Sequence, residues 1–241
     1  MTTQIRGLLF DLGGTLFSYA IRPEMGRAIF DAAKALDIGA KPSHIGRAWG
    51  EANAETMRAF AERDFFLHRD LFQETLESFA ARFERSVSAE IAEQFEQAQR
   101  QAVIDYLPIR DDTHETLRAL KDRGLYLSIV SNIDDDYLVP MVEKLGLAEV
   151  LNDWTSSEEA RSCKPHDEIF RYSMRKAGVD DPSRVLFVGD SAYHDVAGAR
   201  EVGMRTALIQ EEGVVAPGSD AGSEHGADHV IEALSELLEL V

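Results

Sequence analysis

The chain has 241 residues, and its 25 Lys and Arg against 43 Asp and Glu give a formal net charge of −18 at pH 7. Proteins that bind nucleic acid neutralise phosphates with a clustered basic face, which this composition does not supply. The same deficit of positive charge argues against anionic membrane surfaces. No apolar run reaches the roughly 20 residues that cross a bilayer, and a hydrophobic content of 44% predicts a globular domain with a large core.

The cysteine content indicates the compartment. Cys163 is the only cysteine, so the chain cannot form a disulfide within itself. The first residues, MTTQIRG, lack the apolar stretch of a signal peptide. We therefore expect a cytoplasmic protein.

Short apolar runs that end in polar residues predict the strands of a sheet. Runs that are apolar on both faces are typical of parallel strands buried between layers of helices. Turn residues follow most of these runs, which sets their carboxyl ends. In chain order, the predicted strands are residues 8–10, 125–130, 184–188, 206–209 and 228–231.

Helical patterns lie between these runs. Asp112, with Glu115 three residues later, is a capping signature, and Gly124 falls where the helix would end. A second apolar face, from Ile169 to Ala177, ends at Gly178. Strands that alternate with helices at this spacing predict right-handed crossovers and an α/β fold with a parallel sheet.

Residues 17–106 have a different character. No strand-like run appears there, and four amphipathic helical patterns follow one another, with apolar stripes such as Ile45, Trp49 and Ala52. We predict an α/β core domain formed by residues 1–16 and 107–241, and a four-helix domain, residues 17–106, inserted after the first strand.

Polar residues at the predicted strand ends indicate chemistry, because ligands of open α/β sheets collect beyond the carboxyl ends of the strands. Carboxylates that two strands deliver to one edge require a cation between them. Mg²⁺ prefers oxygen ligands and shares its shell with phosphates, so it is the expected ion. The residues are Asp11, Thr15, Ser131, Asn132, Asp190 and Asp195, with Lys164 in a loop that opens a helix at Pro165.

Four segments, in this order, resemble the motifs of the haloacid dehalogenase-like (HAD) hydrolase superfamily. They are GLLFDLGGTLF from Gly7, IVSN ending at Asn132, CKP at residues 163–165 and GDSAYHD at residues 189–195. The predicted insert resembles the helical cap of subfamily I of these hydrolases. The resemblance extends from Gly7 to about Gly203 and implies a Rossmann-like core that carries a four-helix cap.

The resemblance also implies a phosphatase mechanism. Asp11 would be the nucleophile that forms an aspartyl-phosphate. Ser131 and Asn132 would bind the transferring oxygens, and Lys164 would hold both the nucleophile and the phosphoryl group. Thr15 would tighten the turn that follows the nucleophile.

The metal site implied by the resemblance holds Mg²⁺. Asp190 would bind the ion directly and Asp195 would support the site, beside the nucleophile Asp11. The residue two positions after the nucleophile contributes its backbone carbonyl in such hydrolases, and here that residue is Gly13.

Gly13 is also the main departure from the family pattern. HAD phosphatases usually have an aspartate at this position, as acid to the leaving oxygen and base to water. Glycine cannot exchange a proton, and general acid/base catalysis contributes about 10²- to 10⁴-fold. We therefore expect slow turnover of alkyl phosphates, whereas leaving groups of low pKa, such as acyl or aryl phosphates, would suffer least.

Two alternatives to a phosphatase of small phosphorylated metabolites stay open. L-2-haloacid dehalogenases attack carbon without a metal and have no aspartate at the position of Gly13. They generally lack the metal-binding acidic pair, which Asp190 and Asp195 preserve, and their cap arginine follows a tryptophan, whereas Gly50 follows Trp49. The second alternative is a catalytically weakened HAD-like binding protein.

Four further side chains are titratable and lie in the insert or near the motifs. His68, in the inserted segment, would replace the missing acid if the cap brought it to the leaving group. His194 lies beside the acidic pair in the sequence, but we expect it to face the following helix. Glu158 and Glu159 are expected to be solvated loop charges.

Overall fold

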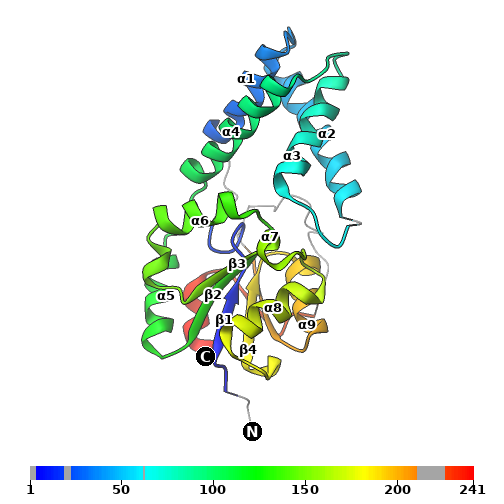
Figure 1. The fold of residues 1–241 in the computed structure, drawn as a ribbon. Helices are drawn as coiled ribbons and strands as arrows, with labels where there is room; N and C mark the ends of the chain where they lie inside the picture. The colour runs from blue at the N-terminus through cyan, green and yellow to red at the C-terminus, as the bar shows by residue number, and fades with distance from the viewer. Residues whose placement is uncertain (1–3, 19–22, 62, 211–225) are drawn as a thin grey trace. The chain divides into compact units, whose positions relative to one another are not determined.

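We obtained a computed structural model of the chain (Figure 1), which describes residues 4–18, 23–61, 63–210 and 226–241. The chain divides into two compact units. Unit 1 comprises Met1–Ala20 and Pro108–Val241, and unit 2 comprises Ile21–Leu107.

Unit 1 is built on a six-stranded sheet in the order β3-β2-β1-β4-β5-β6, in which every neighbouring pair is parallel. The chain leaves the central strand β1 toward β2 and β3, then returns to place β4, β5 and β6 on the other side. The strand order therefore reverses between β1 and β4, where α/β proteins bind their ligands. The strands are β1 (Gly7–Phe10), β2 (Tyr126–Ser131), β3 (Asp153–Ser156), β4 (Val185–Gly189), β5 (Arg205–Ile209) and β6 (His229–Ile231).

The sheet confirms the predicted α/β fold and adds a strand that the sequence did not indicate. Strand β3 has the sequence DWTS, without an apolar run, yet Thr155 and Ser156 are buried because the strand pairs with β2. The strand is held in the sheet by pairing with β2, and it also contacts α7 and α8, so its place does not come from its own hydrophobicity.

Helices flank the sheet, and two of them end as predicted. Gly124 follows α5 and Gly178 follows α8, and both glycines have the positive φ that suits a helix end. Asp112 occupies the predicted N-cap position of α5, but its side chain makes no cap hydrogen bond there, and its carboxylate instead accepts a hydrogen bond from the Ser235 N–H at 3.0 Å. The helices of unit 1 are α5 (Thr113–Asp122), α6 (Asp135–Lys144), α7 (Ser157–Ala160), α8 (Asp167–Ala177), α9 (Gly198–Glu201) and α10 (Leu237–Leu240), with a π-helical segment at Ala192–Ala197.

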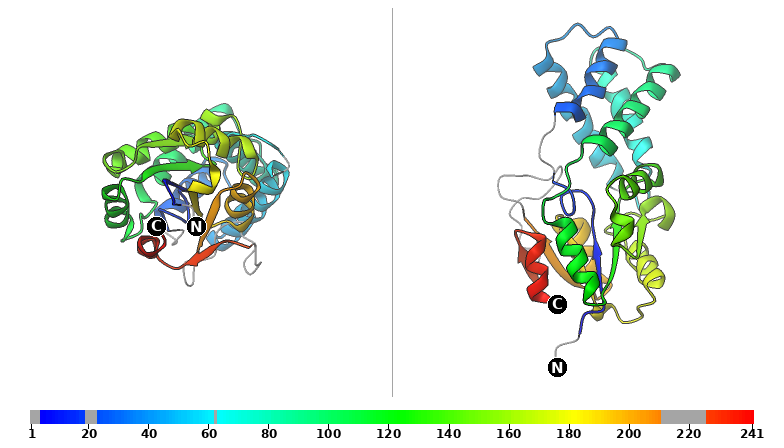
Figure 2. Two further views of the ribbon diagram at one scale, coloured as in Figure 1. Left: turned by 90° about the horizontal axis from the view of Figure 1, so that it is seen from below. Right: turned by 90° about the vertical axis from the view of Figure 1, so that its left-hand side faces the viewer.

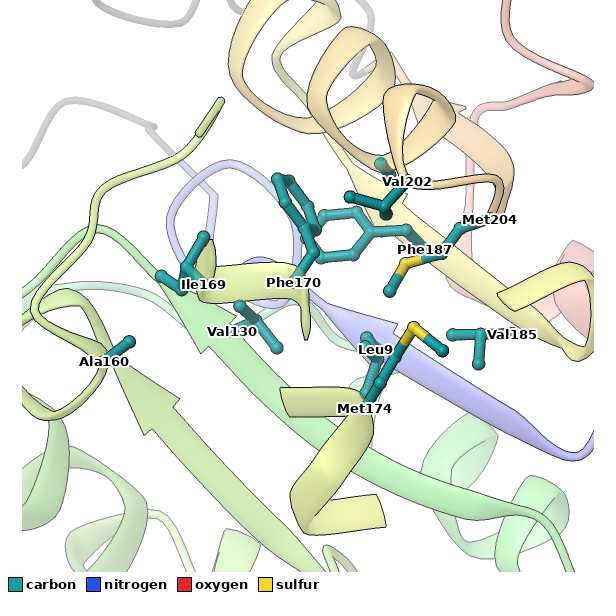
Figure 3. Close-up of a cluster of buried hydrophobic side chains, with 11 residues drawn as sticks. Leu9, Val130, Ala160, Ile169, Phe170, Met174, Val185, Phe187, Val202 and Met204 are labelled. Atoms are coloured by element: carbon teal, nitrogen blue, oxygen red, sulfur yellow. The ribbon is translucent and has the colours of Figure 1, made fainter. Parts of the chain in front are cut away.

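A hydrophobic core joins the sheet to α8 and α9 (Figure 3). Phe170 of α8 meets Phe187 of β4 edge to face, with ring centroids 5.1 Å apart, and Leu9 of β1 lies in the same cluster. On the opposite side, α10 packs beside α5 (Figure 2). All of β1 is buried, as expected of a central strand covered on both faces, so its carboxyl end is held firmly.

Unit 2 is helical. Helix α1 packs with α4 and α2 packs with α3, and Trp49 contacts the rings of Phe79 and Phe95 in the core, at 5.7 and 5.3 Å between centroids. Ser88 begins α4, because its hydroxyl accepts the Ile91 N–H at 3.3 Å. None of the helices in the described part of the chain is both long and apolar enough to cross a membrane. The helices of unit 2 are α1 (Arg27–Ala35), α2 (Pro42–Phe60), α3 (His68–Ala81) and α4 (Ala89–Tyr106).

Candidate active site

Asp11 lies directly after β1, at the point where the strand order reverses. Its backbone N–H donates to the Val188 carbonyl at 2.9 Å, which continues the ladder with β4, and the residue is only 8% exposed. The Oδ1 atom of Asp11 accepts hydrogen bonds from Lys164 and Ser131, at 2.6 and 3.1 Å. Within the described residues Oδ2 accepts none, so it is the oxygen that is available to react.

Lys164 is a buried cation between two carboxylates. Its Nζ lies 2.6 Å from Oδ1 of Asp11 and 2.6 Å from Oδ1 of Asp195. Burial alone would lower the pKa of Lys164, but the charges and hydrogen bonds of the two aspartates outweigh it and raise the pKa to about 12. Lys164 is therefore positively charged at neutral pH.

Three carboxylates converge on this lysine. Oxygen atoms of Asp11, Asp190 and Asp195 all lie within 4.8 Å of one another. Burial, then the charges of Asp11 and Asp195, raise the pKa of Asp190 to about 8, and burial raises the pKa of Asp195 to about 6. One lysine cannot neutralise three ionised carboxylates, so without a further cation Asp190 keeps its proton at neutral pH, and a bound cation could take the place of that proton.

The donor set fits a hard divalent cation. The groups that converge here are carboxylates, without thiols or imidazoles among the clustered ligand atoms, and oxygen ligands of this kind suit Mg²⁺, Mn²⁺ or Ca²⁺. Both oxygens of Asp195 are already engaged, with Lys164 and with the Ser191 N–H at 2.9 Å. Asp190 is thus better placed than Asp195 as a direct ligand, with Asp195 in support.

Ser131 and Asn132, the two polar residues at the end of β2, make different contacts. Ser131 donates to the candidate nucleophile Asp11. The Asn132 amide forms a reciprocal pair with the backbone of Lys164, donating from Nδ2 to its carbonyl at 2.9 Å and accepting its N–H at Oδ1, at 2.6 Å. Asn132 therefore holds the loop that delivers the lysine.

The loop after Asp11 is closed by backbone contacts. The N–H groups of Leu16 and Phe17 both donate to the Leu12 carbonyl at 3.0 Å. The Oγ1 atom of Thr15 is buried and has no hydrogen-bond partner among the described residues, so the turn is not tightened through this hydroxyl. Arg110, which sequence analysis missed, donates to the Gly14 carbonyl at 2.7 Å and secures the loop.

Comparison with known proteins agrees with this geometry. The family model of haloacid dehalogenase-like hydrolases matches residues 5–203. The chain belongs to this family. It is 27% identical to a ribulose-1,5-bisphosphate 5-phosphatase of Halopiger xanaduensis, over 97% of this chain and 98% of that one. It is 29% identical to a phosphoglycolate phosphatase of Pectobacterium atrosepticum, over 84% and 81%.

Solved structures share the fold of this HAD-like hydrolase. The magnesium-bound HAD hydrolase YfnB of Bacillus subtilis superposes with a TM-score of 0.77 at 19% identity, covering 98% of both chains. The L-2-haloacid dehalogenase RSc1362 superposes with a TM-score of 0.71 at 20% identity, covering 99% of both chains. At these identities the likeness establishes the fold alone.

Two small residues of the hydrolase position Asp195. A Cβ atom on Gly189 would lie 2.3 Å from Cγ of Asp195, so only glycine leaves room for this carboxylate. Ser191, which sequence analysis missed, donates its N–H to Asp195 and begins the π-helical segment with its hydroxyl. A hydroxyl residue directly after a Gly-Asp strand end was the available signal for this role.

Among the other candidates, His194 and the two glutamates differ from expectation. The His194 ring turns back to Ser191, with 3.1 Å between Nδ1 and the hydroxyl. Glu158 accepts the Asp135 N–H at 3.0 Å and Glu159 pairs with Lys176 at 3.0 Å, so neither is a merely solvated charge.

His68 lies within unit 2. Its ring centroid is 5.5 Å from that of Phe66 and 6.1 Å from that of Phe72, so the imidazole sits in an aromatic setting. That His68 replaces the missing acid stays a hypothesis.

Proposed function

We propose that this hydrolase is a magnesium-dependent phosphatase that acts on small phosphorylated metabolites through an aspartyl-phosphate on Asp11. The observation that carries the proposal is the position of Lys164 between Asp11 and Asp195, with Asp190 beside them. Phosphoryl transfer requires positioning and neutralisation of charge more than covalent chemistry, and this cluster offers both.

In the proposed reaction, Oδ2 of Asp11 attacks phosphorus. The new bond is the Oδ2–P bond, and the bond that breaks joins phosphorus to the leaving oxygen, which departs with its electron pair. Lys164 and Ser131 hold Oδ1 and so orient the carboxylate for attack. Ser131 and Asn132 are also proposed to contact the transferring oxygens. A water oxygen then bonds to phosphorus as the Oδ2–P bond breaks, which regenerates the Asp11 carboxylate and releases inorganic phosphate that carries the protons of the water.

The proposed metal ligands are Asp11, Asp190 and the Gly13 carbonyl, with Asp195 in support. When bound, Mg²⁺ would neutralise the carboxylates and the phosphate charge, which allows a carboxylate to approach an anionic substrate. In a chain of net charge −18, long-range steering opposes anionic substrates, so local positive charge must bind them.

A phosphate-release screen of metabolites, with Mg²⁺ or with a chelator, tests this proposal. We expect release that requires the metal and is lost in Asp11→Asn, together with an acid-stable, hydroxylamine-labile label on Asp11 after brief exposure to radiolabelled acetyl phosphate. Wild-type turnover by Asp11→Asn would contradict the covalent mechanism.

Gly13 predicts the preference among leaving groups. Without an acid at this position, aryl and acyl phosphates should be better substrates than alkyl phosphates. If only the acid is missing, Gly13→Asp should accelerate alkyl phosphate hydrolysis by about 10²-fold or more. An unchanged rate would contradict the view that a missing acid limits turnover.

The absence of an aspartate at position 13 is also compatible with the dehalogenase alternative. A segment of this chain covering 42% of it is 32% identical to the (S)-2-haloacid dehalogenase 4A of Burkholderia cepacia. The converging carboxylates Asp190 and Asp195 favour the phosphatase instead. Halide release from 2-chloropropionate in the presence of a chelator would favour the dehalogenase. Tight partner binding without either activity would favour a weakened HAD-like protein.

We further propose that the helices of residues 17–106 act as a cap that selects the substrate, as the family resemblance implies. The names of the phosphatase relatives support a small phosphorylated substrate. A cytoplasmic location belongs to the same proposal and is supported by the single cysteine, Cys163. Exchange of residues 17–106 for the cap of a relative should change substrate preference while leaving the dependence on Asp11 intact.

A further inference from the structure

Tyr193 and His194 lie between Asp190 and Asp195 in the sequence, but the proposed reaction gives them no role. They belong to the π-helical segment Ala192–Ala197, which begins three residues after β4 and contains Asp195. Such segments are frequent at functional sites, where they place particular side chains at a cost in helical regularity.

The His194 ring is held in one orientation. Its backbone N–H donates to the Ser191 hydroxyl at 3.0 Å, and the same hydroxyl lies 3.1 Å from Nδ1 of the ring. Because the hydroxyl oxygen already accepts a backbone N–H, we assign its own proton to the bond with Nδ1. The ring proton then lies on Nε2, which is left as a fixed hydrogen-bond donor.

Ser191 connects the ring to the acidic cluster. Its hydroxyl meets the imidazole, and its backbone N–H donates to Oδ2 of Asp195 at 2.9 Å. Oδ1 of the same carboxylate accepts a hydrogen bond from Lys164 at 2.6 Å. With its proton on Nε2, the ring can donate a hydrogen bond there without giving up that proton.

Tyr193 offers a flat apolar surface beside this donor. It is 55% exposed, one of the few large hydrophobic side chains exposed among the described residues. Its ring packs edge to face on His194, with centroids 5.1 Å apart and planes at 75°. An exposed aromatic face next to a fixed donor is suited to a planar group that carries an acceptor oxygen.

We propose that Tyr193 and His194 form the leaving-group subsite of this hydrolase, and that they select phosphate esters of planar, acidic hydroxyl compounds. This inference rests on the proposed phosphatase function. His194 Nε2–H donates to the ester oxygen as the P–O bond breaks, and Tyr193 contacts the planar group. The leaving oxygen keeps its electron pair and departs as an anion, and His194 retains its proton. The subsite thereby replaces part of what the side chain missing at Gly13 would supply.

The test compares substituted phenyl phosphates whose leaving groups differ in pKa. Losing one hydrogen bond to developing charge should lower kcat/KM of His194→Leu by about 10- to 100-fold for phenyl phosphate. The loss should be smaller for dinitrophenyl phosphate, so the plot of log kcat/KM against leaving-group pKa becomes steeper. His194→Gln, whose amide N–H reaches a similar place, should recover part of the loss.

Tyr193 is tested through KM. Tyr193→Ala should raise KM for phenyl phosphate several-fold and leave acetyl phosphate unaffected, whereas Tyr193→Phe should behave as the wild type. The matched control is His229→Leu, which removes a histidine from the edge strand β6 and should leave the slope unchanged. Magnesium dependence and melting temperature, measured for each variant, detect a merely structural effect.

The outcomes separate the two proposals. Equal losses across all phenyl phosphates, or none, would overturn the subsite while phosphatase activity that depends on Asp11 remained. If the wild type hydrolyses no phosphate ester in a manner that depends on Asp11, the phosphatase proposal and the subsite are both overturned.

Discussion

Replacement of Asp190 by asparagine should stabilise the metal-free protein and greatly weaken its stabilisation by magnesium. The pKa of Asp190 is raised from 3.8 to about 8 by burial and by the charges of Asp11 and Asp195. Each pKa unit corresponds to about 1.4 kcal/mol, which sets an upper value of about 6 kcal/mol for this one group. Because solvent and neighbouring dipoles relax around such clusters, we expect a stabilisation of about 2–4 kcal/mol near pH 8.

The sign of this stability difference follows from how tightly the folded and unfolded states bind the proton of Asp190. The folded protein binds the Asp190 proton more tightly than the unfolded chain, so the group costs stability as the pH rises from about 4 to about 8. Below about pH 4 both states are protonated and the cost disappears. The difference in free energy of unfolding between Asp190→Asn and the wild type should therefore grow from pH 5 to pH 8.

Urea denaturation followed by circular dichroism, with a chelator present, measures this difference. Asp180→Asn is the control, because it removes one negative charge at an exposed position. Adding Mg²⁺ should stabilise the wild type by mass action and should stabilise Asp190→Asn far less. If the two proteins show parallel stability profiles across this pH range, Asp190 does not carry the cost that we assign to it.

Two glycines give further predictions. Gly189→Ala would place Cβ 2.3 Å from Cγ of Asp195, so phosphatase kcat should fall about 10²-fold as this carboxylate is displaced, and activity equal to the wild type would refute the steric argument. Gly198→Ala would bring Cβ within 2.7 Å of both the Phe170 ring and the Pro165 carbonyl. It should lower the free energy of unfolding by about 1–3 kcal/mol, and an unchanged urea midpoint would show that α8 and α9 separate without cost.

Much of the core could be predicted because its signals are local. The apolar run before Asp11 and the run before Asp190 mark parallel strands, and parallel strands bring their carboxyl ends to one edge. Gly124 and Gly178 end their helices through a backbone conformation that glycine favours. Such features depend on neighbours within a few residues, so a linear sequence contains them.

Features that depend on distant partners could not be read this way. The strand at residues 153–156 is polar in sequence and is recruited by pairing with β2. Asp112 has the local pattern of a helix cap, but its carboxylate binds the N–H of Ser235, 123 residues away. In both cases a tertiary contact satisfies the backbone groups that the local pattern leaves open.

By itself, the sequence determined the α/β class, the order of the motifs and the set of charged residues at the strand ends. Only the tertiary structure decided which of these groups touch. Lys164 is 153 residues from Asp11 along the chain, yet its amine lies 2.6 Å from that carboxylate and from Asp195. The reason is physical: a buried amine requires paired charges to remain ionised, and which carboxylates surround it depends on how the strands and loops pack together.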